Sequence, residues 1–103
     1  MATATKLSKK EITRQLANLT GWKHKRDAIT KEFVVKSFSA AAQFIAKIAP
    51  IANAMDHHPD VELYQYKRVR INLTTHDAGG ITKKDFDLAK KIDKLALRGS
   101  GRE

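Results

Sequence analysis

Three of the four histidines lie in one short window of the chain, and histidine is the side chain best suited to exchange a proton near neutral pH. His57 and His58 are adjacent and precede Pro59, and His76 follows eighteen residues after His58. If the fold brings these rings together, one can deliver a proton to a substrate atom while another removes a proton nearby. General acid and base chemistry is therefore the first hypothesis for this window.

Two other interpretations of these histidines compete with it. Zinc sites with catalytic histidines usually show His-x-x-x-His spacing and a carboxylate ligand, a pattern that the sequence lacks, so we expect no metal. A histidine pair before a proline could also be an ordinary polar connection, and His76 could satisfy a turn. Spacing alone leaves the acid–base site and the polar loop equally open. The fourth histidine, His24, lies among lysines and is expected on the surface.

The composition describes one small domain. The chain has 103 residues, 42% of them hydrophobic, so we expect a single domain over residues 1–103, with residues 1–7 and 98–103 disordered. The absence of cysteine excludes disulfides, thiolate metal sites and thiol nucleophiles. No apolar run is long enough to span a bilayer, and the first residues lack the apolar region of a secretory signal. We therefore expect a cytoplasmic protein.

The charge is strongly basic, because 20 lysine and arginine residues face 11 acidic residues and give a formal charge of +9. Such a balance suits nucleic acid or acidic ligands. The basic residues are scattered through every segment, however, and only 7% of the residues are aromatic, so no platform for stacking bases is evident. We expect a solvated basic surface and no nucleic-acid partner.

The first half of the chain predicts a helix, a hairpin and a second helix. Ser8 and Glu11 have the spacing of a capping box, which predicts a helix over about residues 9–19. The segment 22–38 alternates as two extended stretches around a turn at residues 26–28. Ser39 is expected to cap the second helix, which Pro50 should kink or end near residue 49 before it resumes toward residue 55.

The second half predicts another hairpin and a last helix. In residues 68–75 apolar and polar side chains alternate, which predicts a strand with one face exposed to water. Thr82 and Asp85 then begin a helix with an apolar stripe. Because the strands come as hairpins, we expect an α+β domain with an antiparallel sheet and helices on one face. The loop after the second helix and the end of the last strand can then meet and bring the three histidines into one cleft.

The order of these motifs resembles the pterin-4a-carbinolamine dehydratase family from about residue 11 to residue 93. The resemblance rests on the His-His-Pro run, on Tyr66, on Thr75-His76 before a Gly-Gly turn and on Asp85 at the start of the last helix. Six residues separate Pro59 from Tyr66, nine separate Tyr66 from His76, and eight separate His76 from Asp85. The Gly21-Trp22 pair also fits the family.

The resemblance implies a four-stranded antiparallel sheet with three helices packed on one face, in chains that form dimers or tetramers. The implied reaction is the dehydration of 4a-hydroxytetrahydropterin to quinonoid dihydropterin in tetrahydropterin recycling, without metal or cofactor. By position, the resemblance makes His57, His58 and His76 the acid/base and pterin-binding residues. It places Asp85 and Asn53 with Pro59 at the substrate, and it makes Pro59 and Tyr66 structural, with Tyr66 packed at a strand turn. Trp22 is expected in the core.

One position departs from the family pattern. Asn53 stands where most members have glutamate, and an amide cannot exchange a proton or stabilise an imidazolium as a carboxylate does. Asp56 is a candidate substitute and equally an ordinary loop residue. Asp85 has two interpretations as well, because it is also the acidic member of the Thr82 capping box.

These features favour a hydro-lyase and leave a second hypothesis open. The alternative is a non-catalytic interaction protein on the same fold, since some relatives bind a dimeric transcription factor. Asn53 and the basic charge favour this alternative, whereas the intact set of three histidines disfavours it. Nucleic-acid binding is the third and weakest hypothesis.

Overall fold

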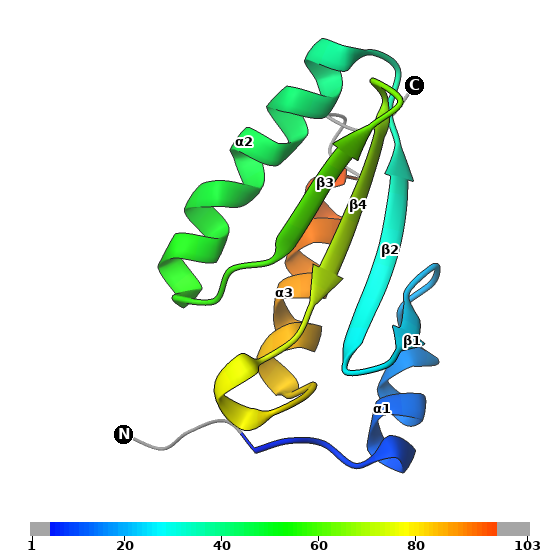
Figure 1. Cartoon of the computed structure of the whole chain (residues 1–103), viewed down its shortest axis with the longest axis vertical. Helices are drawn as coiled ribbons and strands as arrows, with labels where there is room; N and C mark the ends of the chain where they lie inside the picture. The colour runs from blue at the N-terminus through cyan, green and yellow to red at the C-terminus, as the bar shows by residue number, and fades with distance from the viewer. Residues whose placement is uncertain (1–4, 97–103) are drawn as a thin grey trace.

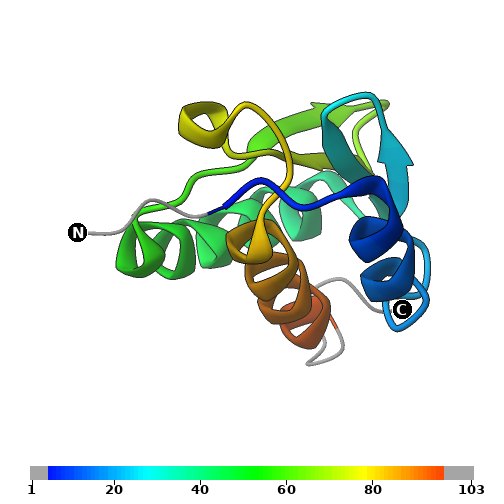
Figure 2. The ribbon, with the colours of Figure 1, turned by 90° about the horizontal axis from the view of Figure 1, so that it is seen from below.

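A four-stranded antiparallel sheet with helices on one face forms the domain (Figure 1). The computed structural model describes residues 5–96. Seen from below, the helices lie together on one side of the sheet and leave its other side open (Figure 2). In chain order the elements are α1 (Lys9–Leu16), β1 (Lys23–Lys25), β2 (Ala28–Val34), α2 (Phe38–Met55), β3 (Asp60–Tyr64), β4 (Arg68–Leu73), the 3-10 turn η1 (His76–Ala78) and α3 (Lys83–Leu95). The predicted fold class and element order are confirmed.

The helix α1 begins where the sequence predicts and ends earlier. The Ser8 hydroxyl accepts a hydrogen bond from the Glu11 backbone N–H at 3.2 Å, as an N-cap does. The Glu11 carboxylate pairs with Arg14 instead of completing a capping box. After Leu16 the chain continues in turns to Gly21, whose φ of 89° lies in the left-handed region that glycine tolerates.

The helix α2 differs from the prediction at its start and in its middle. Ser37, not Ser39, is the N-cap, and its side chain accepts from the Ala40 N–H at 3.0 Å. Pro50 does not end the helix, which runs unbroken to Met55. Proline removes one N–H donor from a helix, and here both Pro50 and Ala46, whose carbonyl loses its partner, are exposed to water. A carbonyl at an exposed position can bind water, so the missing intrahelical bond costs less there than it would in the core.

The sheet order is β1-β2-β4-β3, so the two hairpins meet through a central β2–β4 pair. In this pair Ile29 lies opposite Leu73, and Phe33 lies opposite Val69, all four on the face that the helices cover. Both hairpin turns contain residues with positive φ, which are Arg26 in the first and Gln65 and Tyr66 in the second. The alternation predicted for residues 68–75 is confirmed.

The core lies between the sheet and the helices. Phe33 and Phe44 meet at its centre, with ring centroids 5.0 Å apart. Trp22 is 4% exposed, as predicted, and its indole Nε1 donates to both carboxylate oxygens of Asp93 on α3. Tyr66 was expected to pack at the strand turn, and this prediction is wrong, because the side chain is 58% exposed. Its left-handed backbone in the tight turn directs it away from the core.

The described range, residues 5–96, overlaps one of the two segments that were predicted to be disordered. Residues 1–4 and 97–103 lie outside the described residues, which includes all of the expected segment 98–103. Of the expected segment 1–7, residues 5–7 are described. The Leu7 backbone N–H donates to the Ile81 carbonyl at 2.8 Å, and its side chain packs against the core.

The open face of the sheet carries a network of charged side chains. Arg68 pairs with Glu32 at 2.7 Å, and Arg70 pairs with Glu62 at 2.7 Å. The Tyr64 hydroxyl donates to Glu32 and accepts from Arg70. The hydrogen bond from Tyr64, followed by that from Arg68, lowers the pKa of the Glu32 carboxyl below its ordinary value of 4.5. The expected water-exposed face is therefore filled by mutually paired charges.

Candidate active site

The end of α2 positions the histidine pair. Asp56 caps the helix in the left-handed conformation, with φ 52°, and its backbone N–H donates to the Asn53 carbonyl at 3.1 Å. The His57 N–H donates to the Ala52 carbonyl at 3.0 Å, which closes the turn. Just beyond the helix, His57 is buried and His58 is exposed. Adjacent in sequence, the two rings therefore lie in different environments.

His57 is held by a buried carboxylate on α3. Its Nε2 lies 2.6 Å from Asp85 Oδ1, and Asp85 is 0% exposed. The other oxygen, Oδ2, accepts from the Thr75 hydroxyl and from the Thr82 backbone N–H, each at 2.9 Å. A carboxylate can only accept hydrogen bonds when ionised, so Nε2 of His57 carries the donated proton. This pair fixes the orientation and the tautomer of the His57 ring.

Asp85 serves the helix and the histidine at once. Thr82 caps α3 with its side chain, and Asp85 returns a bond to the Thr82 backbone, which completes the capping box. The Thr82 hydroxyl also meets the Thr75 hydroxyl at 2.8 Å. Both interpretations of Asp85, helix cap and partner of a histidine, are therefore correct. Sequence reasoning named Thr75 and Thr82 as parts of motifs and missed that their side chains both join this network.

His58 meets Asn53 on the surface. Its Nε2 lies 3.0 Å from Asn53 Oδ1. Because an amide oxygen only accepts, Nε2 of the neutral ring carries the proton and leaves Nδ1 as an acceptor. Asp56, the other candidate for the role of the missing acidic residue, is exposed at the helix cap, and within residues 5–96 its carboxylate makes no hydrogen bond or ion pair. Asn53 therefore takes the place beside His58 that the resemblance assigns to a carboxylate.

His76 begins η1 directly after the buried Thr75. The Thr75 N–H donates to the Gly80 carbonyl at 3.0 Å, which closes the loop that carries His76, and Gly79 takes a left-handed φ of 75° within it. His76 is exposed, and its ring makes no hydrogen bond to the described part of the chain. Since Thr75 and His57 both bond to Asp85, the network joins the His76 loop to the histidine pair.

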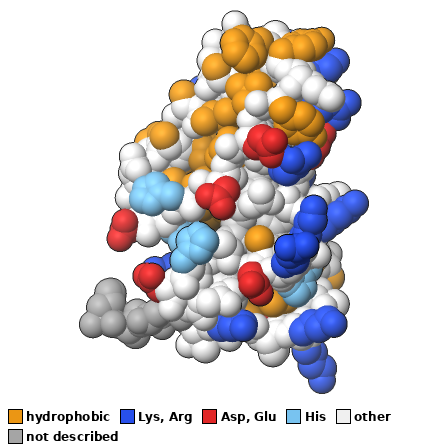
Figure 3. Space-filling view, in the orientation of Figure 1, with side chains coloured by type: hydrophobic (Ala, Val, Ile, Leu, Met, Phe, Trp, Pro, Cys, Tyr) orange, Lys and Arg blue, Asp and Glu red, His pale blue; other side chains and the backbone are white. Residues whose placement is uncertain are grey.

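The surface view agrees with this arrangement. Figure 3 shows two histidine side chains close together on one side of the open face, with acidic side chains nearby, and a further histidine apart from them among basic side chains. His24 is exposed on β1, as predicted. Pro59, expected at the substrate, is half-buried after the pair. Within the described ranges, no three side chains of the metal-binding types converge on one point.

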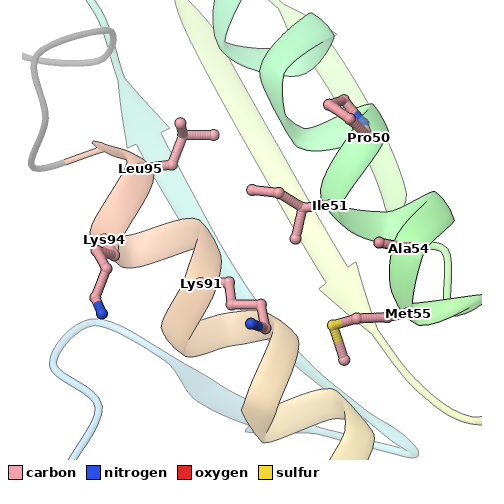
Figure 4. A pocket seen from close by; sticks show the side chains of 7 residues that line it. All are labelled: Pro50, Ile51, Ala54, Met55, Lys91, Lys94 and Leu95. Atoms are coloured by element: carbon pink, nitrogen blue, oxygen red, sulfur yellow. The ribbon is translucent and has the colours of Figure 1, made fainter.

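A separate apolar cleft lies between α2 and α3 (Figure 4). Its volume is about 450 Å³. Ile51 and Met55 point into it from α2, while Lys91 and Leu95 line it from α3. None of its lining residues is a histidine. The apolar cleft and the histidine cluster are therefore at different places on the molecule.

No helix in the described part of the chain is long and apolar enough to cross a membrane.

The fold and the histidine cluster together define a class of protein: a small α+β domain whose polar site is built from imidazoles and one buried carboxylate. Comparison with known proteins then places the chain within that class. Residues 5–95 match the sequence profile of the pterin 4 alpha carbinolamine dehydratase family. The chain belongs to this family.

Individual relatives match the sequence of this chain over most of their length. A protein of Sulfolobus acidocaldarius is 48% identical over 87% of this chain and 98% of its own. One of Sulfurisphaera tokodaii is 51% identical over 87% of this chain and 96% of its own, and both are provisionally named pterin-4-alpha-carbinolamine dehydratase. The crystal structure of a transcriptional coactivator/pterin dehydratase from Brucella melitensis superposes with a TM-score of 0.84 at 36% identity, covering 89% of this chain and 99% of that one.

Proposed function

We propose that this protein is a hydro-lyase that dehydrates 4a-hydroxytetrahydropterin to quinonoid dihydropterin in tetrahydropterin recycling. The observation that carries the proposal is the buried His57–Asp85 pair, joined through Thr75 to the loop of His76 and followed directly by the exposed His58. Family membership and the names of the relatives support it.

The reaction requires two proton transfers on neighbouring atoms. The 4a-hydroxyl must gain a proton so that the C4a–O bond breaks and water leaves. The electron pair of N5 then forms the C4a=N5 double bond as N5 loses its proton. The exposed rings of His58 and His76 supply one acid and one base, and the two transfers leave the site with an unchanged number of protons. His57, fixed by Asp85, completes the proposed set of three histidines, and Asn53 and Pro59 border the substrate.

The test is the rate at which purified protein accelerates dehydration of freshly generated 4a-hydroxytetrahydropterin, followed by ultraviolet absorbance. We expect the wild type to accelerate it and His58→Ala and His76→Ala each to lose about 100-fold or more in kcat. His24→Ala, a histidine outside the cluster, is the matched control and should retain full activity. A folded wild type that gives no acceleration would rule out the enzyme.

A second candidate function is binding of a protein partner without catalysis. The observation that favours it is exposed apolar surface, because Phe38 at the start of α2 is 60% exposed and Val34 at the end of β2 is 50% exposed. The Brucella melitensis relative is described as a transcriptional coactivator as well as a dehydratase. In the rate assay this candidate predicts a folded, inactive wild type.

An exposed apolar residue on an edge strand supports an oligomer. We propose that the chain forms a homodimer or a homotetramer in the cytoplasm. The edge strand β3 pairs on one side only within the described chain, and Val61 on it is 36% exposed. The mass in solution, measured by light scattering, distinguishes these states from a monomer.

A further inference from the structure

A polar cleft of about 570 Å³ lies on the open face of the sheet, on the side away from the helices. Its lining comes from all four strands and from the first hairpin turn. The lining residues that matter here are Lys25, Arg26, Asp27, Thr30, Asp60 and Thr74. This cleft is distinct from the apolar one between α2 and α3, with which it shares no residue.

Two residues that line the cleft lie close in sequence to the exposed histidines. Asp60 follows His58 after Pro59, and Thr74 precedes His76 by two residues. The lining therefore includes a residue two positions along the chain from each of the two exposed histidines that the proposed reaction uses. A pterin held at those rings has its side chain free to run along the cleft.

The strand register shows which residues lie side by side across the sheet at the cleft. Asp60 on β3 lies opposite Asn72 on β4, Asn72 lies opposite Thr30 on β2, and Thr30 lies opposite Lys23 on β1. Neighbouring strands are about 4.8 Å apart, so the step from β4 to β1 spans roughly 10 Å. The β1–β2 turn flanks this row on the side of Thr74, whose hydroxyl bonds to the Asp27 carbonyl of the turn.

The charges of the cleft differ between its two ends. The β3 end carries Asp60, whereas the β1 end carries Lys25 and Arg26. Neither basic residue makes a hydrogen bond or an ion pair through its side chain within residues 5–96. Arg70 also lines the cleft, but Glu62 holds it at 2.7 Å. Figure 3 shows basic side chains on the opposite side of the open face from the two neighbouring histidines.

The turn that carries Arg26 is held in place at a conformational cost. Arg26 has φ 57°, in the left-handed region where glycine would be favoured. The Thr74 hydroxyl donates to the Asp27 carbonyl at 2.5 Å and so ties the turn to the end of β4. A strained backbone that keeps a cation next to a cleft is consistent with a binding role for that cation.

We infer that the substrate of this protein is a tetrahydropterin whose side chain ends in a phosphate, and that Lys25 and Arg26 bind this phosphate. The inference rests on the proposed dehydratase function and specifies its substrate class. The guanidinium of Arg26 suits two phosphate oxygens, and the Lys25 ammonium adds a second positive charge. The Asp27 carboxylate, in the same turn, repels a phosphate and so reduces the expected preference for the phosphorylated over the unphosphorylated substrate.

The experiment compares two substrates that differ only in the phosphate. The 4a-hydroxy derivatives of tetrahydroneopterin and of its terminal phosphate monoester are generated in place, and kcat/KM is measured for each. We expect the wild type to prefer the phosphate monoester, and the double variant Lys25→Gln with Arg26→Gln to lose about tenfold or more of that preference. Its kcat/KM for the unphosphorylated substrate should stay within about twofold of the wild type.

Two further variants sharpen the test. Lys90→Gln with Lys94→Gln removes the same charge from α3, on the other side of the sheet, and should leave the preference unchanged. Asp27→Asn should increase the preference, because it removes the opposing carboxylate and keeps the backbone carbonyl that Thr74 uses. The preference should also shrink as salt is raised. Equal kcat/KM for both substrates in the wild type, or equal losses in the two double variants, would overturn the inference.

The failure of the proposed function can be told apart from the failure of this inference. Calorimetric titration of the unreactive dihydroneopterin and its phosphate monoester measures binding without any reaction. If neither 4a-hydroxy substrate reacts but the monoester binds about tenfold more tightly through Lys25 and Arg26, the dehydratase proposal fails and the phosphate site stands. If both substrates react and the two ligands bind equally, the dehydratase stands and the phosphate site is refuted.

Discussion

Asp85 shows how one side chain can be required by the fold and by the site together. Its Oδ2 completes the cap of α3, and its Oδ1 holds His57. Replacing it would leave buried donors of Thr75 and Thr82 without a partner, which is costly in a protein interior. Loss of activity in an Asp85 variant would therefore not separate a structural role from a catalytic one. The exposed residues His58 and Asn53 are better probes of the chemistry.

Asn53→Glu is expected to raise kcat. In the present chain the Asn53 amide oxygen accepts from His58, and a carboxylate there would stabilise the protonated ring more strongly. We expect a gain of roughly tenfold in kcat with KM changed less, measured with the 4a-hydroxytetrahydropterin assay. Asn53→Gln, which has the length of glutamate without its charge, is the control. An equal gain in both variants would show that side-chain length, not charge, limits the present enzyme.

At the level of elements, the ends of the helices and the turns set the position and direction of each side chain in the site. The left-handed cap at Asp56 ends α2 and places His57 inward and His58 outward. The bridge between Thr75 and Gly80 closes the loop that presents His76. The helix α3 supplies Asp85 from its first turn, where the backbone N–H groups favour an anion. The site thus depends on where three elements end or begin.

Pro50→Ala should make the protein more stable. Alanine restores the backbone N–H that α2 lacks at this position and has a much higher helix propensity than proline, an effect partly offset by greater freedom of the unfolded chain. We expect the free energy of unfolding to rise by about 2 kcal/mol in urea denaturation. Pro50→Gly should gain about 1 kcal/mol less. If Pro50→Ala instead destabilises the fold, then packing of the proline ring at the α2–α3 cleft must outweigh the missing hydrogen bond.

For the whole molecule, the one-sided packing of the helices decides the nature of the open face. The sheet buries Val69, Ile71 and Leu73 under the helices and turns Arg68 and Arg70 to water. Arg70 lies between Glu32 and Glu62 on the neighbouring strands, so the charges largely satisfy one another. Lys25 and Arg26, at the first hairpin turn, make no ion pair with any other residue of the range 5–96.

Glu32→Gln should weaken the fold near neutral pH and have less effect in acid. The hydrogen bonds from Tyr64 and Arg68 lower the pKa of Glu32 in the folded protein below its ordinary 4.5. The ionised carboxylate therefore contributes stability above pH 4.5, and this contribution is lost as the pH falls through the lower folded pKa. Urea denaturation over a pH series would show the two proteins converging in acid.

Tyr64→Phe is the matched control for this effect, because Tyr64 provides the main hydrogen bond that lowers the pKa of Glu32. Its removal should make the stability of the protein less sensitive to acid in the same pH range, although Glu32 remains. If the stability difference between wild type and Glu32→Gln persisted undiminished in acid, the ionised carboxylate would not be its source.

Local patterns in the sequence were sufficient to predict most elements. Periodicity identified three helices and two hairpins, because the side chains that must avoid water recur at the spacing of each structure. The α+β class follows from the same pattern and is confirmed, and the expected burial of Trp22 is confirmed as well. Predictions based on single residues were less reliable, since Ser37 caps α2 in place of Ser39 and Pro50 does not interrupt it. Such details depend on which side of the helix faces water.

By itself, the sequence determined the element types, the family resemblance and the histidines worth testing. Only the tertiary structure decided that β2 pairs with β4, that Asp85 reaches His57 across 28 positions, and that Lys25 shares a cleft with Thr74. The physical reason is that a local pattern specifies which side of an element is buried and says nothing of its partner. Partners are chosen when all the elements pack around one core, and the polar side chains at their ends are then brought together.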